Sequence, residues 1–416
     1  MDVVESSAKK SLIYLFRTLK YRNYRLFFMG QSISLIGTWL QMIAVSWLVY
    51  RLTGSVFMLG LVGFLSRIPT FLMAPFAGVV ADRYDRYKIL ILTQILSMIQ
   101  AFIFAVLVFT GTIQVWHTIL LGISLGLINS FDIPVRQSFV VNMVEDKKDL
   151  GNAIALNSSM VNGARLIGPT VAGLLIAAVG EGWCFSLNAI SFVAVISSLL
   201  MMKIKPREFK RTNKSGITEF KEGFSYAYKH KTISSLLLLL AIASLIAMPY
   251  QVLMPAFSRE ILKGGPKMFG FLMAAAGFGA LAGALYLGSR KSTEGLGRIV
   301  ILSSVLFGAG LMMFSFAQNA WSSGVFLVIA GFGMMVQAAG TNTILQTLVE
   351  EDKRGRIMSL YTMAFMGMQP FGSLLVGKLA DVFGMPVTIC IGGAGCGLSA
   401  LLIGRKMLFL KTIDIN

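Results

Sequence analysis

Long runs of apolar residues, separated by short polar segments, dominate the chain. A helix that crosses the hydrocarbon core of a membrane needs about 20 mostly apolar residues, and these runs reach or exceed that length. We therefore predict an all-α polytopic membrane protein with twelve transmembrane helices. The expected spans are residues 26–50, 55–81, 88–110, 113–142, 152–179, 183–202, 233–257, 268–289, 298–317, 320–346, 357–380 and 385–404.

One long polar stretch, residues 203–232, separates six predicted spans from six. Its part from Ile217 to Tyr228 carries aromatic and aliphatic residues at helical spacing with charged residues between them. This pattern is typical of an amphipathic helix at a membrane surface, and a solvated linker fits it equally well. We expect an N-terminal six-helix bundle over 1–202, a cytoplasmic linker over 203–232 and a C-terminal six-helix bundle over 233–416.

The two halves also resemble each other. Glycines in and after the fifth span recur at one constant offset in and after the eleventh. The matched residues are Gly163, Gly168, Gly173 and Gly180 in the first half and Gly367, Gly372, Gly377 and Gly384 in the second. Such a repeat in the same orientation is the pattern of transporters whose two bundles are related by an axis along the membrane normal, with the substrate site between them near the midplane.

Composition supports a membrane protein, and charge gives its orientation. Hydrophobic residues make up 56% of the chain and charged residues 13%, yet the net charge is +18. With both termini in the cytoplasm, most of the 37 Lys and Arg residues fall in cytoplasmic segments, as the positive-inside rule requires. The basic excess therefore indicates topology and not a nucleic-acid surface. We expect a multi-pass protein of a bacterial inner membrane, without a signal peptide.

Several classes of chemistry are not indicated. We find no Gly-x-x-x-x-Gly-Lys-Ser/Thr phosphate loop, and with two histidines and three scattered cysteines no metal-site spacing. The cysteines, Cys184, Cys390 and Cys396, lie in or beside apolar spans and are interpreted as small apolar residues. We predict that the protein is not an enzyme and has no cofactor and no metal.

The loop between the second and third spans carries the string Gly78-Val-Val-Ala-Asp82-Arg83-Tyr-Asp85-Arg86. In this loop, the string resembles the signature of the major facilitator superfamily, and the twelve spans and the repeat extend the resemblance over the whole chain. The resemblance implies a conformational latch, in which Asp82 faces the N-terminus of a neighbouring helix and the arginines pair with acids of the fourth span. The alternative is a generic basic loop. The equivalent loop of the second half has Leu287 in place of the Asp, so the latch is expected on one side only.

Two further regions narrow the resemblance. The fifth span contains Gly163, Gly168, Pro169 and Gly173, small residues that permit a kink and tight packing; they are similar to the Gly-Pro motif of the drug:proton antiporter branch. One departure is that Ala172 stands where the motif usually has a glycine. The strings from Asn129 to Phe139 and from Leu150 to Ser158 resemble the enterobactin-exporter and macrolide-efflux group.

Ionisable residues within spans are the best functional candidates, because each is expensive to bury. Asp132 is the one carboxylate predicted well inside a span, and Arg136 follows at i+4, where a pair can form. The rise per residue places Arg165 at a similar depth, so that Asp132 and Arg165 could meet. Asp132 is interpreted either as a proton-coupling carboxylate or as a permanent partner of an arginine.

Arg67 and Arg165 lie in the middle of the second and fifth spans. They are candidates for binding an anionic or hydrogen-bond-accepting substrate, such as a catecholate siderophore. The alternative is that they snorkel or hold backbone carbonyls of broken helices. Further substrate-cavity candidates are polar residues in spans, at each of which bonding between helices is the competing interpretation. They are Gln31, Gln41, Tyr250, Gln251, Gln337 and Asn342.

From these residues and the resemblance we predict a secondary active transporter that exports drug-like compounds or siderophore-like anions by alternating access and proton antiport. The expected partners are a small-molecule substrate, protons or another coupling ion, and the lipid bilayer; we expect a monomer and no nucleic acid. The alternatives are an uptake symporter or facilitator for a small polar solute, and a non-transporting receptor or scaffold with the same fold.

Overall fold

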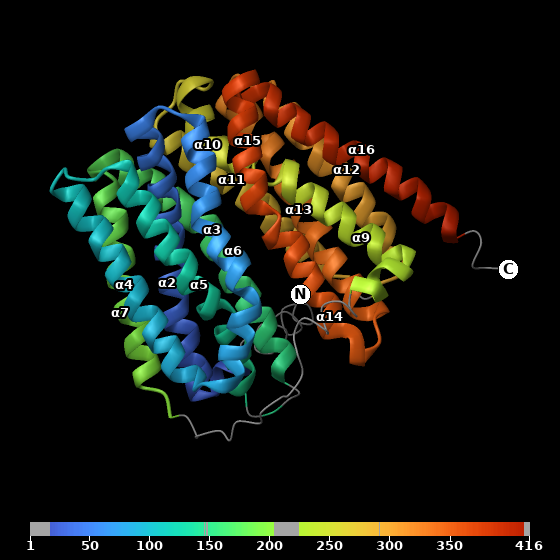
Figure 1. The fold of residues 1–416 in the computed structure, drawn as a ribbon, viewed down its shortest axis with the longest axis horizontal. Coiled ribbons are helices and arrows are strands. Elements are labelled where there is room, and N and C mark those ends of the chain that lie inside the picture. Colours follow the sequence, from blue (N-terminus) through green and yellow to red (C-terminus); the bar gives the residue numbers. More distant parts are fainter. Residues whose placement is uncertain (1–16, 145, 147–148, 204–223, 291, 412–416) are drawn as a thin grey trace, which may run out of the picture. The chain divides into compact units, whose positions relative to one another are not determined.

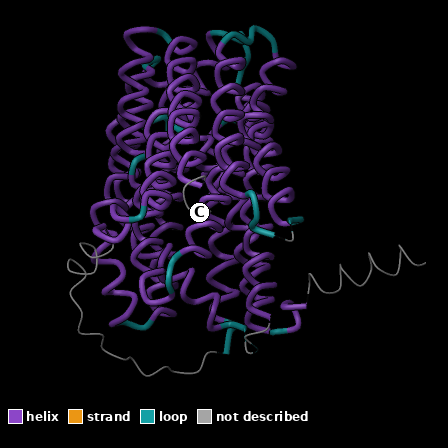
Figure 2. Tube along the Cα trace, turned by 90° about the vertical axis from the view of Figure 1, so that its right-hand side faces the viewer, coloured by secondary structure: helices purple, strands orange, loops and turns teal. Residues whose placement is uncertain are grey.

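The computed structural model describes residues 17–144, 146, 149–203, 224–290 and 292–411. For residues 74–83, 138, 140–142, 352 and 406–411 it describes the backbone alone. In the described part of the chain the regular elements are all helical, and Figure 2 shows no strand among them. The all-α fold predicted from the apolar runs is confirmed.

The first half of the chain forms six long helices, preceded by the short 3-10 helix η1 (Arg17–Lys20) (Figure 1). The six are α2 (Arg22–Thr53), α3 (Val56–Arg83), α4 (Arg86–Phe109), α5 (Val115–Asn142), α6 (Leu150–Val179) and α7 (Glu181–Leu200). Their connections are short, because the apolar runs are long and the polar segments between them are brief. Residues 224–229 form one more short helical piece before the second half.

In the second half, two of the six spans are built from several pieces. The elements are α9 (Lys231–Ile242), η3 (Ala243–Ala247), α10 (Tyr250–Glu260), α11 (Pro266–Gly288), α12 (Leu296–Ser315), α13 (Ala320–Leu348), α14 (Glu351–Thr362), η4 (Met363–Gly367), α15 (Gln369–Phe383) and α16 (Met385–Lys411). The segments η3 and η4 are π-helical. They interrupt the seventh and eleventh spans, respectively.

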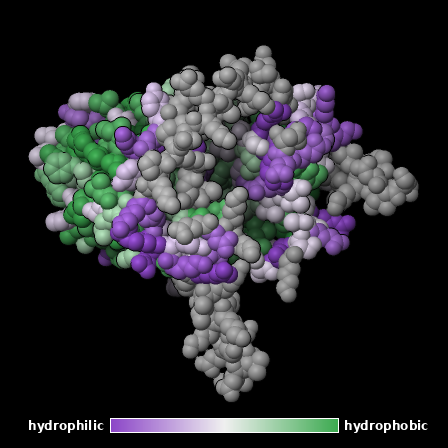
Figure 3. Space-filling model, turned by 90° about the horizontal axis from the view of Figure 1, so that it is seen from below, coloured by the Kyte–Doolittle hydropathy of each residue, from purple (hydrophilic) through white to green (hydrophobic). Residues whose placement is uncertain are grey.

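Eleven of the described helical segments are long and apolar enough to cross a membrane. The remaining predicted span, the eleventh, corresponds to the interrupted segment α14–η4–α15. Every predicted span therefore has a helical counterpart, with ends that differ by a few residues. Figure 3 shows hydrophilic residues gathered on the face seen from below, while hydrophobic residues continue along one side. This distribution is typical of helices that present their sides to lipid and their ends to water.

The chain divides into two compact units. One comprises Met1–Ala44 and Leu72–Thr212, and the other comprises Val45–Phe71 and Asn213–Asn416. Helices α2 and α3 thus contribute to both units. The bundle boundaries expected from the sequence stay a prediction, and the division of the structure groups the Val45–Phe71 segment with the C-terminal helices.

Small residues allow the helices of the second unit to approach closely. A Cβ added at Gly279 of α11 would lie 2.0 Å from the carbonyl oxygen of Val328 in α13, and one added at Gly331 would lie 2.1 Å from that of Ala276. Backbones this close require glycine, which is how membrane helices gain packing without a hydrophobic driving force between them. In the first unit, Gly37 of α2 similarly faces Asn188 and Ser191 of α7.

Candidate functional site

Two spans of the second unit are each interrupted by a π-helical segment that is followed by a proline. In the seventh span the Met248 amide donates to the Ala243 carbonyl over 2.8 Å, which is a π-helical bond, and Pro249 follows without an amide hydrogen. In the eleventh span η4 is followed by Met368, Gln369 and Pro370. The two breaks lie close together, because a Cβ at Gly372 of α15 would lie 2.2 Å from the Leu245 carbonyl oxygen. Single π turns of this kind occur frequently at functional sites.

A polar chain of contacts lies at these breaks. Arg67, midway along α3, donates from Nη1 to the Oε1 atom of Gln369 over 2.5 Å. The Gln369 amide nitrogen in turn lies 4.0 Å from the sulfur of Met248. All three residues belong to the second unit, since its Val45–Phe71 segment contains Arg67. Sequence reasoning identified Arg67 but missed Gln369; the signal was a Gln-Pro pair in the middle of an apolar run.

Three phenylalanine rings pack together next to Gln369. The Phe371 ring, two residues after Gln369, meets Phe64 at 5.8 Å and Phe71 at 5.7 Å, both edge to face. On η4 the side chains of Met363 and Met366 are 40% and 47% exposed. Aromatic and thioether groups adapt to apolar ligands of different shape. The site therefore offers one cation and a polarisable apolar surface.

Asp132 lies in a different cluster, within the first unit. Its Oδ1 atom accepts from Thr93 Oγ1 over 2.9 Å and from Gln94 Nε2 over 2.7 Å, and Arg136 Nη2 lies 3.2 Å from its Oδ2 atom. The i+4 pair expected from the sequence is thus present. Asp132 is only 4% exposed. Its partners Thr93 and Gln94 belong to α4, so the buried carboxylate links α4 to α5.

Arg165 lies against Trp39, a side chain that also packs between α2 and α6. Its guanidinium lies over the Trp39 ring, 6.0 Å from the centroid. The same Trp39 packs on Gly168, where a Cβ would come within 2.3 Å of the Trp39 Cβ. One glycine of the predicted fifth-span motif therefore serves helix packing, whereas a Cβ at Gly163 would meet nothing within 4 Å. Pro169 and Gly173 are buried within α6. The contact expected between Asp132 and Arg165 stays a prediction.

Gln41, a predicted cavity residue, belongs to a buried chain of amides in the first unit. Its Nε2 donates to Gln100 Oε1 over 2.8 Å, and its Oε1 accepts from Asn188 Nδ2 over 2.7 Å. Gln100 continues the chain to the Leu121 carbonyl. Each amide is almost fully buried. This arrangement supports the alternative interpretation of Gln41, a hydrogen bond between helices.

A second charged cluster joins η1 to the start of α6. Asp149 lies 3.1 Å from Arg17 Nε and 2.8 Å from Lys20 Nζ, and it accepts from the Tyr21 hydroxyl over 2.8 Å. The hydrogen bonds from Lys20 and Tyr21 hold the pKa of the Asp149 carboxyl below its usual value, and the bond to Asp149 raises the pKa of Lys20. Sequence reasoning missed Asp149 because the positive-inside rule counts cations and gives loop acids little weight.

Asn152 extends this cluster. Its side-chain oxygen accepts from the backbone amide of Thr18 over 3.2 Å and also from the Thr18 hydroxyl. Asn152 was part of the string from Leu150 to Ser158 that indicated the subfamily. The structure thus gives this motif residue a role in fixing the start of α6 against η1.

The remaining cavity candidates differ in their surroundings. Gln337 is fully buried, and neither of its amide atoms has a hydrogen-bond partner among the described residues. Tyr250 is buried with its ring edge toward Phe307, at 6.4 Å. Asn342 accepts from Gln346 over 2.5 Å. Gln31 is buried and Gln251 is half-buried. Their contact with substrate stays a prediction.

The expected latch falls mostly on side chains outside the described ones, those of Gly78, Asp82 and Arg83. Asp85 is described, and it caps α4: its Oδ1 accepts from the Tyr87 amide over 2.9 Å. A carboxylate in this position accepts from an otherwise unpaired helix amide and interacts favourably with the helix dipole. The latch itself, with Arg86 as a member, stays a prediction.

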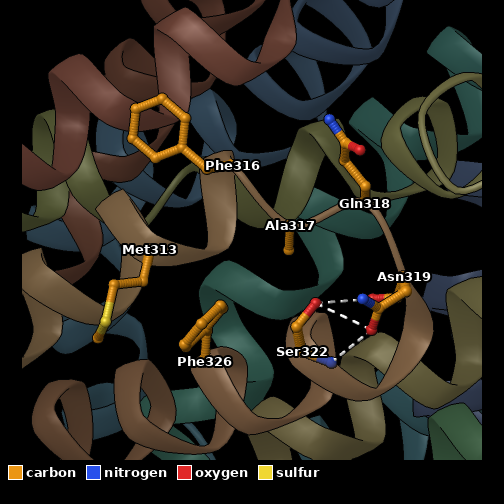
Figure 4. Close-up of a pocket in the computed structure, with 7 residues that line it drawn as sticks. All are labelled: Met313, Phe316, Ala317, Gln318, Asn319, Ser322 and Phe326. Carbon is orange, nitrogen blue, oxygen red and sulfur yellow. Dashed lines mark hydrogen bonds between the residues drawn. The ribbon is translucent and has the colours of Figure 1, made fainter.

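A hollow of about 470 Å³ lies at the turn between α12 and α13. Figure 4 shows its lining, in which Met313, Phe316 and Phe326 supply apolar surface and Asn319 bonds Ser322. The Asn319 side chain caps α13. The hollow contains none of the predicted site residues and is open at a helix end, so we assign the candidate site to Arg67 and Gln369.

Comparison with known proteins identifies relatives over nearly the full length. Residues 15–414 match the family model described as transmembrane secretion effector. The chain is 28% identical over 393 residues to the staphyloferrin A transporter of Staphylococcus aureus, covering 92% of this chain and 95% of that protein. It is 24% identical to macrolide efflux protein A of Streptococcus pyogenes (88% and 92%) and 26% identical to the enterobactin exporter EntS of Escherichia coli (93% and 91%).

Solved structures share the fold. The nucleoside transporter NupG superposes with a TM-score of 0.74 at 12% identity, covering 93% of this chain and 98% of that one. A bacterial homologue of the lysosomal transporter Spinster, crystallised facing inward, gives a TM-score of 0.67 at 15% identity (92% and 95%). The resemblance and the fold class expected from the sequence are confirmed. The family and these relatives are membrane transporters and not enzymes.

Proposed function

The chain belongs to the transmembrane secretion effector family of the major facilitator superfamily, and from this premise we propose that it exports a small molecule across the bacterial inner membrane by alternating access coupled to proton antiport. Two relatives are named for the efflux of a macrolide and the export of enterobactin, and a third is named as a transporter of staphyloferrin A. The coverage of both chains by these matches is the observation that carries the proposal.

The substrate site in this proposal lies at the breaks of the seventh and eleventh spans, at Arg67 and Gln369. Non-helical backbone at membrane depth is tolerated where it is buried in protein or lines a cavity. Transporters of this type bind substrate near the midplane. The hydrogen bond from Arg67 to Gln369 supports this placement.

Asp132 is assigned an anchoring role within this proposal. The Asp132 carboxylate accepts from two neutral donors and pairs with Arg136. If Asp132 carried the coupled proton, these contacts would have to break and form again in each transport cycle. Their number supports a permanent link between α4 and α5 over proton coupling.

The orientation proposed is that of the charge distribution, with both termini in the cytoplasm. In this orientation, the Asp149 cluster and residues 224–229 lie on the cytoplasmic side. The working unit proposed is a single copy, because the transport path of this superfamily lies within one chain.

An export assay tests the proposal. A bacterial strain that lacks its own macrolide and siderophore exporters is transformed with this gene, and accumulation of radiolabelled erythromycin and release of enterobactin are measured. The proposal predicts lower accumulation or greater release of at least one compound, and its loss on adding a protonophore. Net accumulation driven by this gene would favour the uptake symporter, and no change with any gradient would favour a receptor.

A further inference from the structure

Arg67 is a cation in the middle of a membrane-spanning helix. Helix α3 has 28 residues and Arg67 lies eleven residues after its first, which places the guanidinium roughly 16 Å along the helix at the usual rise per residue. Desolvating a charge at such a depth is expensive, so intramembrane arginines mark substrate pathways or pair with an acid. The partner of Arg67 therefore indicates which of these two roles applies.

That partner is neutral. The guanidinium donates to the side-chain amide oxygen of Gln369. Among the described residues of the second unit, the carboxylates lie at or near helix ends, where Glu260 ends α10, Glu351 begins α14 and Asp381 lies in the last turn of α15. None of them belongs to the middle of a helix. At its own depth, Arg67 thus has an amide where a carboxylate would be the stronger acceptor.

A charged acceptor would outcompete this amide. In a bond between a guanidinium and a carboxylate both partners are charged, and the contact is often bidentate, whereas Gln369 offers one neutral oxygen. The guanidinium has five donors, so a ligand with two anionic oxygens can engage two of them in parallel. Such a ligand would replace one hydrogen bond to a neutral oxygen by two hydrogen bonds to charged oxygens.

Gln369 is also held weakly on its other side. Its amide nitrogen reaches the Met248 sulfur at 4.0 Å, and a thioether is a weak acceptor. The residue begins α15, directly after Met368 and the π-helical segment η4. Rotating the side chain away from Arg67 therefore breaks one bond between side chains and leaves the helix backbone bonds in place.

From this geometry we propose that Gln369 is a placeholder for substrate: its Oε1 atom occupies the position on Arg67 that an anionic oxygen of the substrate takes on binding. The substrate class is an organic anion that carries carboxylate or catecholate oxygens on an apolar body. The body would lie along Phe64, Phe71 and Phe371 and the methionines of η4. This inference rests on the proposed transport function and specifies the substrate class of that site.

A placeholder and a direct ligand respond oppositely to substitution. Gln369→Ala removes the competing acceptor, so an anion should bind equally well or a few-fold more tightly. Gln369→Glu supplies a permanent carboxylate of the same shape, which should weaken anion binding about tenfold or more by occupying the guanidinium and repelling the ligand. Arg67→Lys keeps the charge but loses the two-donor fork and should also weaken binding.

The experiment measures binding to the purified full-length protein in nanodiscs by isothermal titration calorimetry. The probes are citrate for carboxylates, 2,3-dihydroxybenzoate for catecholates and tetraphenylphosphonium as a cation. Gln346→Glu, on an exposed position of α13, is the matched control for an added carboxylate. Gel filtration and thermal unfolding verify that each variant is folded. If Gln369→Glu fails to fold, the comparison of Gln369→Ala with Arg67→Lys carries the test.

The expected result is binding of at least one anion to the wild type and to Gln369→Ala, and weaker binding to Gln369→Glu and Arg67→Lys alone. Binding of neither anion to the wild type, or loss of binding in Gln369→Ala as severe as in Arg67→Lys, overturns the proposal. Flux measured in vesicles separates the two proposals. Transport of a compound by a protein that binds neither anion overturns only the placeholder, and anion binding without any flux overturns only the transport function.

Discussion

Gln94 on α4 donates a hydrogen bond to the Asp132 carboxylate on α5 over 2.7 Å. This contact joins two neighbouring helices of the first unit deep inside the protein, and the i+4 arginine completes the site. Asp132 is the one described mid-helix carboxylate of the first unit and its partners belong to that unit, whereas Arg67 and Gln369 belong to the second.

Substituting Asp132→Asn should reduce stability while leaving coupling intact. The variant keeps an acceptor for Thr93 and Gln94 but removes the charge that balances Arg136, which is 26% exposed in its side chain. We expect a loss of about 2 kcal/mol in the free energy of unfolding, the range for a hydrogen bond to a charged group. Thermal unfolding measures it, with the exposed Asp381→Asn as the control near zero. A change in the proton-to-substrate stoichiometry at unchanged stability would make Asp132 the coupling group.

Gln41→Leu should destabilise the first unit. The substitution leaves the Gln100 oxygen and the Asn188 amide without their partner in a buried place, and each unsatisfied buried group costs about 1–3 kcal/mol. Thermal unfolding of this variant is compared with that of Gln346→Leu, whose side chain is exposed. Substrate affinity should stay within a few-fold of the wild type. A large loss of affinity with unchanged stability would instead place Gln41 in the substrate cavity.

The Asp149 cluster should give a pH-dependent contribution to stability. Because the pKa of Asp149 is lowered in the folded state, its contribution is present above the unfolded value of about 3.9 and is lost as the pH falls through the folded value. The pKa of Lys20 is raised, so its contribution is present below about 10.4 and is lost as the pH rises beyond that.

The difference in melting temperature between the wild type and Asp149→Asn should therefore be constant between about pH 5 and pH 9 and shrink at lower pH. Differential scanning fluorimetry in a series of buffers measures this difference. Asp381→Asn, at an exposed position, serves as the control, and its melting temperature should follow the wild type throughout. A difference that persists at about pH 2 would contradict the role given to the carboxylate.

Gly60 lies where α3 packs closely against α15, and a larger residue there should disrupt this packing. A Cβ at Gly60 would lie 2.5 Å from the Ser373 carbonyl oxygen and 2.9 Å from the Gly377 Cα. Gly60→Val should force the two helices apart and increase, several-fold, the maleimide labelling of a cysteine introduced at the buried Leu59 in a cysteine-free background. Gly163→Ala, where a Cβ meets nothing within 4 Å, should leave labelling unchanged. Equal labelling in both variants would contradict this packing.

The sequence contained most of the fold, because the membrane demands long apolar runs and short polar connections. The break before Pro370 was not predicted, because it lies in a run that otherwise resembled a continuous helix. Site geometry was harder to predict. The rise per residue gives the depth of Asp132 and Arg165 but not the direction in which each side chain leaves its helix. The partners observed, Gln94 and Trp39, depend on that rotation and on which helices pack together.

The proposal of proton-coupled export is tested most directly in inside-out vesicles with an imposed acidic lumen. Enterobactin or erythromycin is added outside, and a pH-sensitive dye reports the lumen. Substrate is expected to enter while the lumen becomes more alkaline than it does without substrate. Omitting this chain should abolish both changes, and collapsing the gradient beforehand with a protonophore should abolish substrate entry. Absence of any substrate-dependent pH change, or protons and substrate moving in the same direction, would contradict it.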